Sequence, residues 1–203
     1  MNAQQRAQWL SDRCGKLTAS SMIDAMDFLA KGGESSKRKN LKIEKVAERM
    51  TGLSVSHYVT PQMQWGLDKE PEAKQSFELA TGKFITDCLL FDHPWIEYFS
   101  ATPDGLIDDD AVIEFKCPET TTHIDWIAGG EVPAKHKPQI LAQLACTGRT
   151  RAIFVSYDPR LKNPEKRLFI REWIPDRLEV EKVEAAAIQF LKEVDELFDL
   201  VNC

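Results

Sequence analysis

The chain reads Pro103-Asp104-Gly105-Leu106-Ile107-Asp108-Asp109-Asp110-Ala111-Val112-Ile113-Glu114-Phe115-Lys116 at its centre. Two β-prone runs, residues 104–108 and 111–117, flank an acidic turn, which is the pattern of a β-hairpin. A hairpin brings Asp104 close to Glu114. Because side chains alternate along a strand, we expect Glu114 and Lys116 on one face, about 6.6 Å apart, and Phe115 on the other.

Two carboxylates and a lysine in this arrangement are typical of a site for a hard cation and a phosphate. Mg²⁺ prefers carboxylate and carbonyl oxygens and leaves positions for water and phosphate oxygens. An ammonium beside it can orient an attacking water and neutralise charge that grows on the phosphate. The pattern therefore predicts a site for phosphodiester hydrolysis. The alternative is an exposed hairpin with a surface Glu–Lys pair, which these residues alone leave open.

Pro103-Asp104 followed by Glu114-Phe115-Lys116 resembles the core of the PD-(D/E)xK nucleases. The surrounding blocks narrow the resemblance to the lambda-type exonucleases, also called the YqaJ-like viral recombinase family. Six blocks match in chain order: Trp9-Leu10-Ser11-Asp12-Arg13-Cys14-Gly15-Lys16-Leu17-Thr18-Ala19-Ser20, Trp65-Gly66 with Glu70, Thr102 to Leu106, Glu114 to Pro118, Gln139 and Gln143 before Thr147-Gly148, and Ser156 to Arg160.

The resemblance implies a role for each residue of the central blocks. Asp104 and Glu114 would be metal ligands, together with the main-chain carbonyl of Phe115. Glu70 would complete or adjust the metal set from its helix. Lys116 would orient the nucleophilic water.

Four further residues receive roles from the resemblance. Gln139 matches the family's motif glutamine, which supports the lysine and the water. Arg13, Thr18 and Ser20 fall in the block that forms a pocket for the terminal 5′-phosphate, where an arginine supplies a rigid donor fork. The chain departs from the lambda-type enzyme at residues 120–123, Thr-Thr-Thr-His, where that enzyme has another phosphate-binding arginine. Threonine hydroxyls or His123 would have to replace it.

The resemblance also implies an activity and an assembly. The expected function is Mg²⁺-dependent 5′ to 3′ exonuclease action on double-strand DNA, with Mn²⁺ as a substitute ion, producing 3′ single-strand overhangs for phage-type recombination. The expected partners are DNA ends, a single-strand annealing protein and two further copies in a homotrimer ring. Two alternatives remain at this stage: a site-specific endonuclease with the same metal core, and a non-catalytic DNA-binding subunit.

Composition is consistent with this class of protein. The 203 residues are 43% hydrophobic, so we expect one nuclease domain spanning residues 1–203. We find neither an apolar run of about 18 residues nor a signal-peptide core, which predicts a cytoplasmic protein of a bacterial host or prophage without a membrane partner. The five cysteines are scattered without a C-x-x-C pair, which favours free thiols.

The net charge of −6 is unevenly distributed. Residues 176–203 carry eight acidic and three basic side chains, so the rest of the chain is almost neutral. Basic residues concentrate in two stretches that either line a DNA-backbone surface or form ordinary solvated faces. The first contains Lys31, Lys37, Arg38, Lys39, Lys42 and Lys45, and the second contains Arg149, Arg151, Arg160, Lys162, Lys166, Arg167 and Arg171.

Hydrophobic periodicity predicts the order of elements. Expected helices span residues 3–12, 19–30, 40–51, 61–81, 121–129, 135–147 and 176–200. Expected strands span residues 83–92, 95–100, 104–108, 111–117, 151–157 and 167–174. This order predicts an α/β fold with a central mixed, twisted β-sheet flanked by helices. The resemblance adds that this is a restriction-endonuclease-like core.

Overall fold

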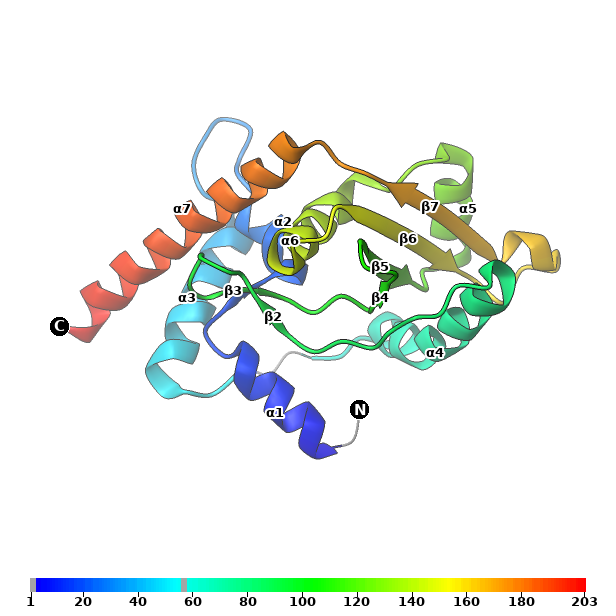
Figure 1. Ribbon diagram of the computed structural model, residues 1–203. Helices are drawn as coiled ribbons and strands as arrows, with labels where there is room; N and C mark the ends of the chain where they lie inside the picture. Colours follow the sequence, from blue (N-terminus) through cyan, green and yellow to red (C-terminus); the bar gives the residue numbers. More distant parts are fainter. Residues whose placement is uncertain (1–2, 56–57) are drawn as a thin grey trace.

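A four-stranded sheet lies at the centre of the fold in this computed structural model, which describes residues 3–55 and 58–203. Strands β5 and β6 run parallel, whereas the two outer pairs are antiparallel. The sheet is therefore mixed, and the predicted α/β class is confirmed (Figure 1). Its strands, in spatial order, are β4 (Gly105–Ile107), β5 (Ala111–Lys116), β6 (Arg151–Tyr157) and β7 (Leu168–Trp173).

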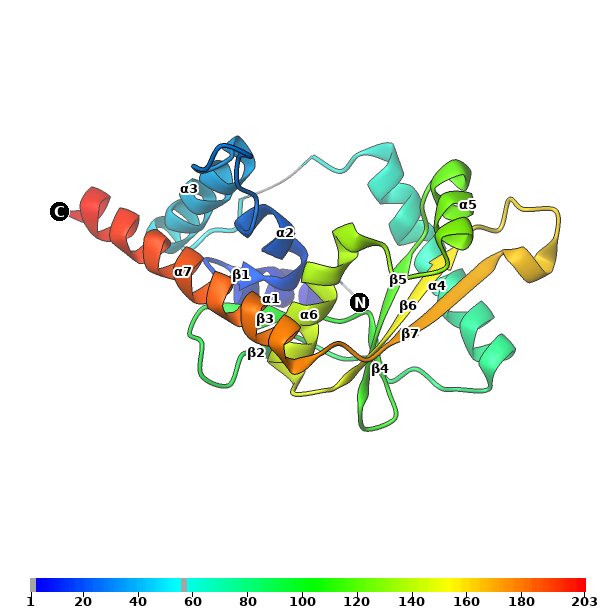
Figure 2. The same ribbon diagram turned by 90° about the horizontal axis from the view of Figure 1, so that it is seen from above.

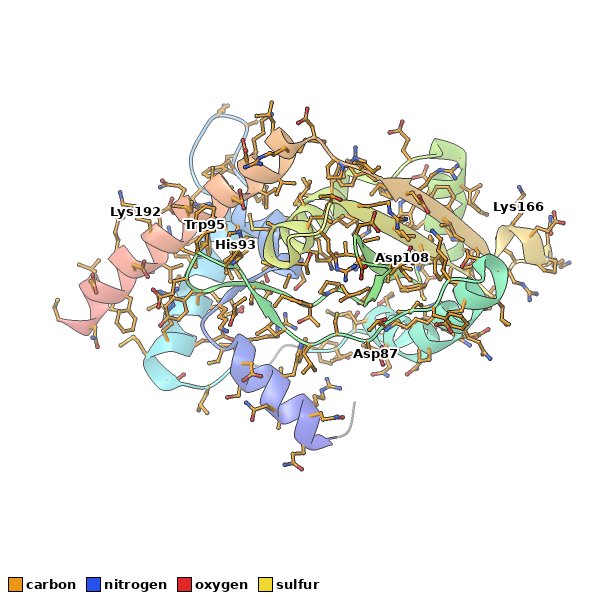
Figure 3. All side chains as sticks on the ribbon, in the orientation of Figure 1. Asp87, His93, Trp95, Asp108, Lys166 and Lys192 are labelled. Carbon is orange, nitrogen blue, oxygen red and sulfur yellow. The ribbon has the colours of Figure 1, made fainter. Side chains whose placement is uncertain are left out.

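The β4–β5 hairpin forms as predicted, with Gly105 opposite Ile113. Asp108 turns the chain in the left-handed region at a φ of 50°, and Figure 3 labels it at the hairpin. Arg149 donates to the main-chain carbonyls around this turn and holds it. A side chain at Gly105 would collide with Ile85, so only glycine allows the 84–86 segment to cross this closely.

Helices cover both faces of the sheet (Figure 2). Helix α4 (Pro61–Thr81) lies on one face, where the ring of Phe77 meets the ring of Phe115 edge-on at 6.0 Å. Helices α5 (Thr120–Gly129) and α6 (Lys137–Thr147) pack on the opposite face against Val112 and Phe154. The alternation along β5 therefore directs Glu114 and Lys116 to the side of α6.

A second layer packs on the outer side of α6. It contains a small sheet in the order β1–β3–β2, formed by β1 (Leu17–Thr18), β3 (Phe99–Ala101) and β2 (Phe91–Asp92). The long helices α3 (Ser36–Thr51) and α7 (Arg177–Asn202) lie against each other, with Phe190 fully buried. The remaining helical segments are α1 (Ala3–Arg13), α2 (Met22–Ala25) and three short 3₁₀ turns, η1 (Ala19–Ser21), η2 (Ala134–His136) and η3 (Pro164–Lys166).

The predicted helix over residues 19–30 is wrong, because only η1 and the single turn of α2 form there. Arg38 accounts for the early end: its Nε donates to the carbonyl of Ala25 at 2.8 Å, at the end of α2. The following helix starts at Ser36, ahead of the predicted residue 40, because the Ser35 hydroxyl accepts from the main-chain N–H of Arg38 at 3.1 Å and caps the helix.

The predicted strands 83–92 and 95–100 are much shorter in the structure. Only residues 91–92 and 99–101 form β2 and β3, and Thr86 adds an isolated bridge to Leu106. The ring of His93 lies between these strands, where its Nδ1 accepts from the main-chain N–H of Ile96 and its Nε2 meets Glu184 of α7 at 3.0 Å. The side chain of His93, rather than main-chain bonds between two strands, therefore provides hydrogen bonds to this loop.

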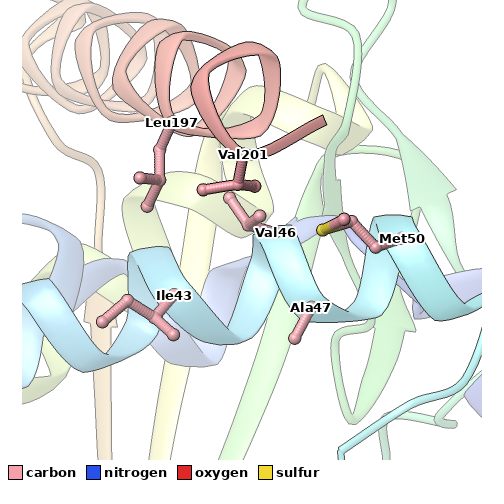
Figure 4. Close-up of a pocket in the computed structure, with 6 residues that line it drawn as sticks. All are labelled: Ile43, Val46, Ala47, Met50, Leu197 and Val201. Atoms are coloured by element: carbon pink, nitrogen blue, oxygen red, sulfur yellow. The ribbon is translucent and has the colours of Figure 1, made fainter. Parts of the chain in front are cut away.

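The first basic stretch does not line a surface for DNA at its centre. Arg38 is buried and pairs with Glu34 and Glu193, and Lys42 pairs with the same two carboxylates. Together with the Arg49–Asp195 pair, α3 thus contacts two of the eight acidic side chains over residues 176–203. Beside these ion pairs the two helices leave a shallow apolar groove (Figure 4), lined by Ile43, Val46, Ala47, Met50, Leu197 and Val201.

Most arginines of the second basic stretch also bind groups within the protein. Arg151 pairs with Asp110 at 2.8 Å, and Arg167 donates to the carbonyl of Leu161. Arg160 binds the buried carboxylate of Asp158. Arg151, Arg160 and Arg167 thus have protein partners, and a DNA-backbone surface along this stretch stays a prediction. Separately, none of the helices within residues 3–55 and 58–203 has the length and apolarity needed to cross a bilayer.

Candidate active site

The predicted acidic residues meet at the end of β5. Strand β4 begins at Gly105, so residues 114–116 of β5 extend past it along the sheet edge. The side chain of Asp104 occupies this edge: its Oδ2 accepts a hydrogen bond from the main-chain N–H of Phe115 at 2.7 Å. The hairpin thus places Asp104 beside Glu114, as the spacing predicts.

Glu114 is buried, and three side chains donate to its two carboxylate oxygens. Lys116 Nζ lies 2.5 Å from Oε1, and Gln139 Nε2 donates to the same oxygen at 2.6 Å. Gln143 Nε2 donates to Oε2, also at 2.6 Å. Charge-assisted hydrogen bonds of this length hold a carboxylate firmly in one orientation.

Both glutamines lie on the same face of α6, one turn apart, and therefore reach Glu114 together. Gln139 also accepts from Lys116 Nζ at 3.4 Å, so it contacts both Glu114 and the lysine. The sequence assigned no role to Gln143. Its i+4 spacing from Gln139 was the available signal, but only the packing of α6 on β5 shows that the two side chains share one carboxylate.

Burial and neighbouring charge perturb the ionisation of this cluster. Burial raises the pKa of Asp104 well above its usual range, and the carboxylates of Glu114 and Glu70 raise it further. Burial alone would lower the pKa of Lys116, but Glu114 and Asp104 outweigh it and hold that pKa above its usual value. The lysine therefore stays charged, and Asp104 takes up a proton more readily than an exposed aspartate does.

Glu70 reaches the site from α4. The buried side chains of Ala73 and Phe77 fix this helix on the sheet, and Glu70 lies on the adjoining turn. Its Oε1 pairs with Lys74 Nζ at 3.0 Å. Glu70 is close enough to Asp104 to raise its pKa, so the structure brings together the four charged residues predicted for catalysis.

The donor set suits a hard divalent cation, since it consists of carboxylate oxygens and the carbonyl of Phe115. The crowding of like charge around Asp104 is the electrostatic arrangement that a cation would relieve. Among the residues that the structure describes, no three acidic, histidine or cysteine side chains are close enough to enclose a metal in this conformation. Glu114 and Glu70 are each engaged by a lysine instead.

The three residues predicted for the 5′-phosphate also come together. Arg13 Nη2 lies 3.2 Å from Thr18 Oγ1 and 3.5 Å from Ser20 Oγ, and its guanidinium stacks on the ring of Trp9 at 4.0 Å. Trp9 in turn donates to Thr102 Oγ1, two residues before Asp104. Burial lowers the pKa of Arg13, which Glu48 partly offsets, so a partly desolvated cation faces hydroxyl groups.

His123 does not replace the arginine that the lambda-type enzyme has in this region. The side chain is fully buried, with Nδ1 at 2.6 Å from Ser156 Oγ and Nε2 at 2.9 Å from the carbonyl of Lys166. Both ring nitrogens therefore have partners within the core. Thr120 likewise donates to Asp158.

Comparisons with known proteins identify relatives of this chain. The model of the YqaJ-like viral recombinase domain matches residues 8–150. The crystal structure of the alkaline exonuclease LHK-Exo from Laribacter hongkongensis is 34% identical, with a TM-score of 0.87 over 97% of this chain and 96% of that chain. The structure of LHK-Exo in complex with dAMP gives 34% identity and a TM-score of 0.88, covering 96% and 95% of the two chains.

The chain therefore belongs to the YqaJ-like viral recombinase family and is homologous to an alkaline exonuclease. A phage-related exonuclease from Haemophilus somnus 129PT shares the fold alone, at 13% identity and a TM-score of 0.69 over 92% of this chain and 96% of that chain. A search of curated protein sequences found no match.

Proposed function

We propose that this protein is a Mg²⁺-dependent exonuclease that degrades double-strand DNA from 5′ ends and leaves 3′ overhangs for phage-type recombination. The observation that carries the proposal is the cluster at the end of β5. Lys116 pairs with a buried Glu114 that two glutamines orient, beside an Asp104 whose pKa is raised by crowded carboxylates. The relatives named as exonucleases support the same reaction class.

In this proposal Asp104, Glu114, Glu70 and the carbonyl of Phe115 hold the cation, with Mn²⁺ as a substitute for Mg²⁺. The bound ion supplies Lewis acidity toward a phosphate oxygen. Lys116 orients the attacking water and offsets negative charge at the phosphate. Gln139 and Gln143 hold the carboxylate of Glu114 in one orientation through their donated hydrogen bonds.

The proposed direction of degradation rests on Arg13, Thr18 and Ser20. Their contacts form a small polar cluster that Trp9 links to Thr102, two residues before Asp104. A terminal 5′-phosphate bound there would place the first phosphodiester at the carboxylates. The complex of LHK-Exo with dAMP supports nucleotide binding in this family.

The assembly in this proposal is a homotrimer ring around DNA, formed by one nuclease domain over residues 1–203 in each copy, in the cytoplasm of a bacterial host. Its product, a 3′ overhang, is the substrate of a single-strand annealing partner. The membership of the chain in a viral recombinase family supports a role in recombination. Exposed apolar side chains near the start of α4, at Tyr58, Met63 and Leu67, supply surface for contacts between copies.

Digestion of linear and closed circular duplex, with and without Mg²⁺, tests the proposal. We expect hydrolysis of the linear duplex alone, only with the cation, and none by Asp104→Ala. Cleavage of the closed circle would favour the site-specific endonuclease. Hydrolysis of neither substrate would favour a DNA-binding subunit. The intact set of Lys116, Asp104, Glu114 and Glu70 argues against that last alternative.

A further inference from the structure

A second lysine faces the carboxylate cluster from α4. Lys74 lies one helical turn beyond Glu70, and its Nζ is 3.0 Å from Glu70 Oε1 and 4.0 Å from Asp87 Oδ1. It also lies within the electrostatic field of Asp104. Figure 3 labels Asp87 in the segment between α4 and β2. Because the buried Phe77 fixes α4 on the sheet, the direction of Lys74 is set by the fold.

The two carboxylates proposed to complete the metal set are thus each paired with a lysine. Lys116 contacts Glu114, and Lys74 contacts Glu70. A cation at Asp104 needs an oxygen of Glu70, and Lys74 competes for that oxygen. We propose that Lys74 is a positioning residue of this site, which holds Glu70, releases that carboxylate to the divalent cation and then contacts a DNA phosphate.

This role of Lys74 rests on the proposed nuclease function. It couples the binding of the divalent cation to the binding of DNA. Once Glu70 binds the cation, the ammonium of Lys74 loses its nearest anion. Its side chain is one quarter exposed, so a DNA phosphate can approach and replace the lost partner. DNA binding then favours the released state of Glu70, and cation and DNA reinforce each other's binding.

Calorimetric titration of the DNA-free protein with Mg²⁺ measures the competition directly. Removing a positive charge near a divalent ion should tighten its binding, so we expect Lys74→Met to bind Mg²⁺ about tenfold more tightly than wild type. Lys69→Met is the matched control. Lys69 forms the same kind of pair on the same helix, 2.9 Å from Glu72, and its loss should leave cation affinity unchanged.

The salt dependence of DNA binding shows whether the released ammonium of Lys74 contacts a DNA phosphate. With Mg²⁺ present, loss of one phosphate contact should lower the slope of log affinity for linear duplex against log salt concentration by about 0.9. We expect this change for Lys74→Met but for neither Lys69→Met nor Lys74→Arg, which keeps the charge. If Lys74 only held Glu70 against α4 and made no contact with DNA, Lys74→Met would leave the slope unaltered.

Several outcomes separate this inference from the proposed function. Equal Mg²⁺ affinity in wild type and Lys74→Met, or an unaltered salt slope, overturns the role of Lys74, while digestion of linear duplex by the wild type still supports the nuclease. If Lys74→Met does not fold, Lys74→Arg decides: it should bind Mg²⁺ like wild type, and tenfold tighter binding would contradict competition by charge. A wild-type protein that binds no divalent cation overturns both proposals.

Discussion

At the scale of single residues, the crowding of carboxylates in the site changes the ionisation of Asp104. Its pKa is raised in the folded protein, first by burial and then by Glu114 and Glu70. Because the pKa of Asp104 is higher in the folded than in the unfolded protein, protonation of this group stabilises the fold. This stabilisation is fully present below the unfolded pKa of about 4 and is lost as pH rises through the folded pKa. In the absence of divalent cations, stability should therefore fall across that window.

Asp104→Asn should remove this pH dependence, because its amide oxygen can still accept from Phe115 without a charge. In EDTA we expect the variant to be more stable than wild type at pH 8, and the difference to shrink when Mg²⁺ is added to the wild type. Thermal unfolding from pH 4 to 9, in EDTA and in Mg²⁺, measures both effects. A variant less stable than wild type at pH 8 in EDTA would contradict the crowding of charge.

Lys116 acts on the nucleophile in the proposed mechanism. Lys116→Ala should lower kcat about a hundredfold or more while leaving the KM for duplex DNA nearly unchanged. Lys116→Arg should restore little activity, because a planar fork does not replace a compact ammonium. Steady-state kinetics on linear duplex distinguish the outcomes, and an unchanged kcat with a raised KM would place Lys116 in DNA binding.

Gln143 donates to Glu114 through its amide nitrogen, while its buried Oε1 has no partner within the described structure. Gln143→Leu should lower kcat about tenfold, since one donor to the carboxylate is lost. Stability should change little, because the substitution also removes a buried unpaired oxygen. Gln189→Leu is the control: Gln189 donates to Glu193 at 3.0 Å on an exposed helix face. Equal kcat in both variants would reject the assignment.

The sequence predicted Asp104, Glu114 and Lys116 because their spacing depends only on a hairpin and on alternation along one strand. It did not predict Gln143 as a partner of Glu114 or Lys74 as a partner of Glu70. The Gln143–Glu114 contact depends on how α6 packs against β5, and packing between distant segments leaves no periodic signal in the sequence. The Lys74–Glu70 pair has i,i+4 spacing within α4, but only the packing of that helix on the sheet brings it close to Asp104. The structure places Asp104, Glu114 and Lys116 together, as their spacing predicts.

At the scale of elements, the end of α1 and the turn after β1 form the proposed phosphate pocket. A charge-assisted contact is worth about 1.5 to 3 kcal/mol, so 5′-phosphorylated ends should be degraded about ten- to a hundredfold faster than 5′-hydroxyl ends. Without a second arginine, since His123 is in the core, we expect the lower end of this range. Arg13→Ala should remove most of the preference, and Arg177→Ala, on the exposed start of α7, should retain it.

Duplexes labelled on one strand at either end decide the direction of degradation in the same assay. Mononucleotides should appear first from the 5′ terminus. If they appear first from the 3′ terminus, or if Arg13→Ala keeps its full preference for phosphate, neither the pocket nor the direction of degradation is as proposed.

Elements that differ from the sequence-based prediction differ for local physical reasons. The amphipathic helix α7 and the helix α4, which begins at Pro61 after the capping Thr60, match the prediction closely. The region 19–30 fails because Arg38 binds the carbonyl of Ala25 from another helix, and the region 83–92 fails because an isolated bridge at Thr86 replaces a strand. Periodicity cannot register competition from side chains that are distant in sequence.

At the scale of the whole molecule, the proposed ring predicts a mass. Light scattering on the purified protein should give about three times the 23.1 kDa of one chain. The exposed apolar residues near the start of α4 would then be covered, and substituting Leu67 by Ser should shift the mass toward one chain. A stable monomer that still degrades linear duplex would show that the ring is not needed for hydrolysis.

The position of α7 also has a consequence during synthesis. Phe190 and Val194 complete the core around α2 and α3, and α6, which carries both glutamines of the site, packs against the same helix. A nascent chain that already contains Asp104, Glu114 and Lys116 therefore still lacks the support that orients them. The site is therefore completed only after α7 has been synthesised.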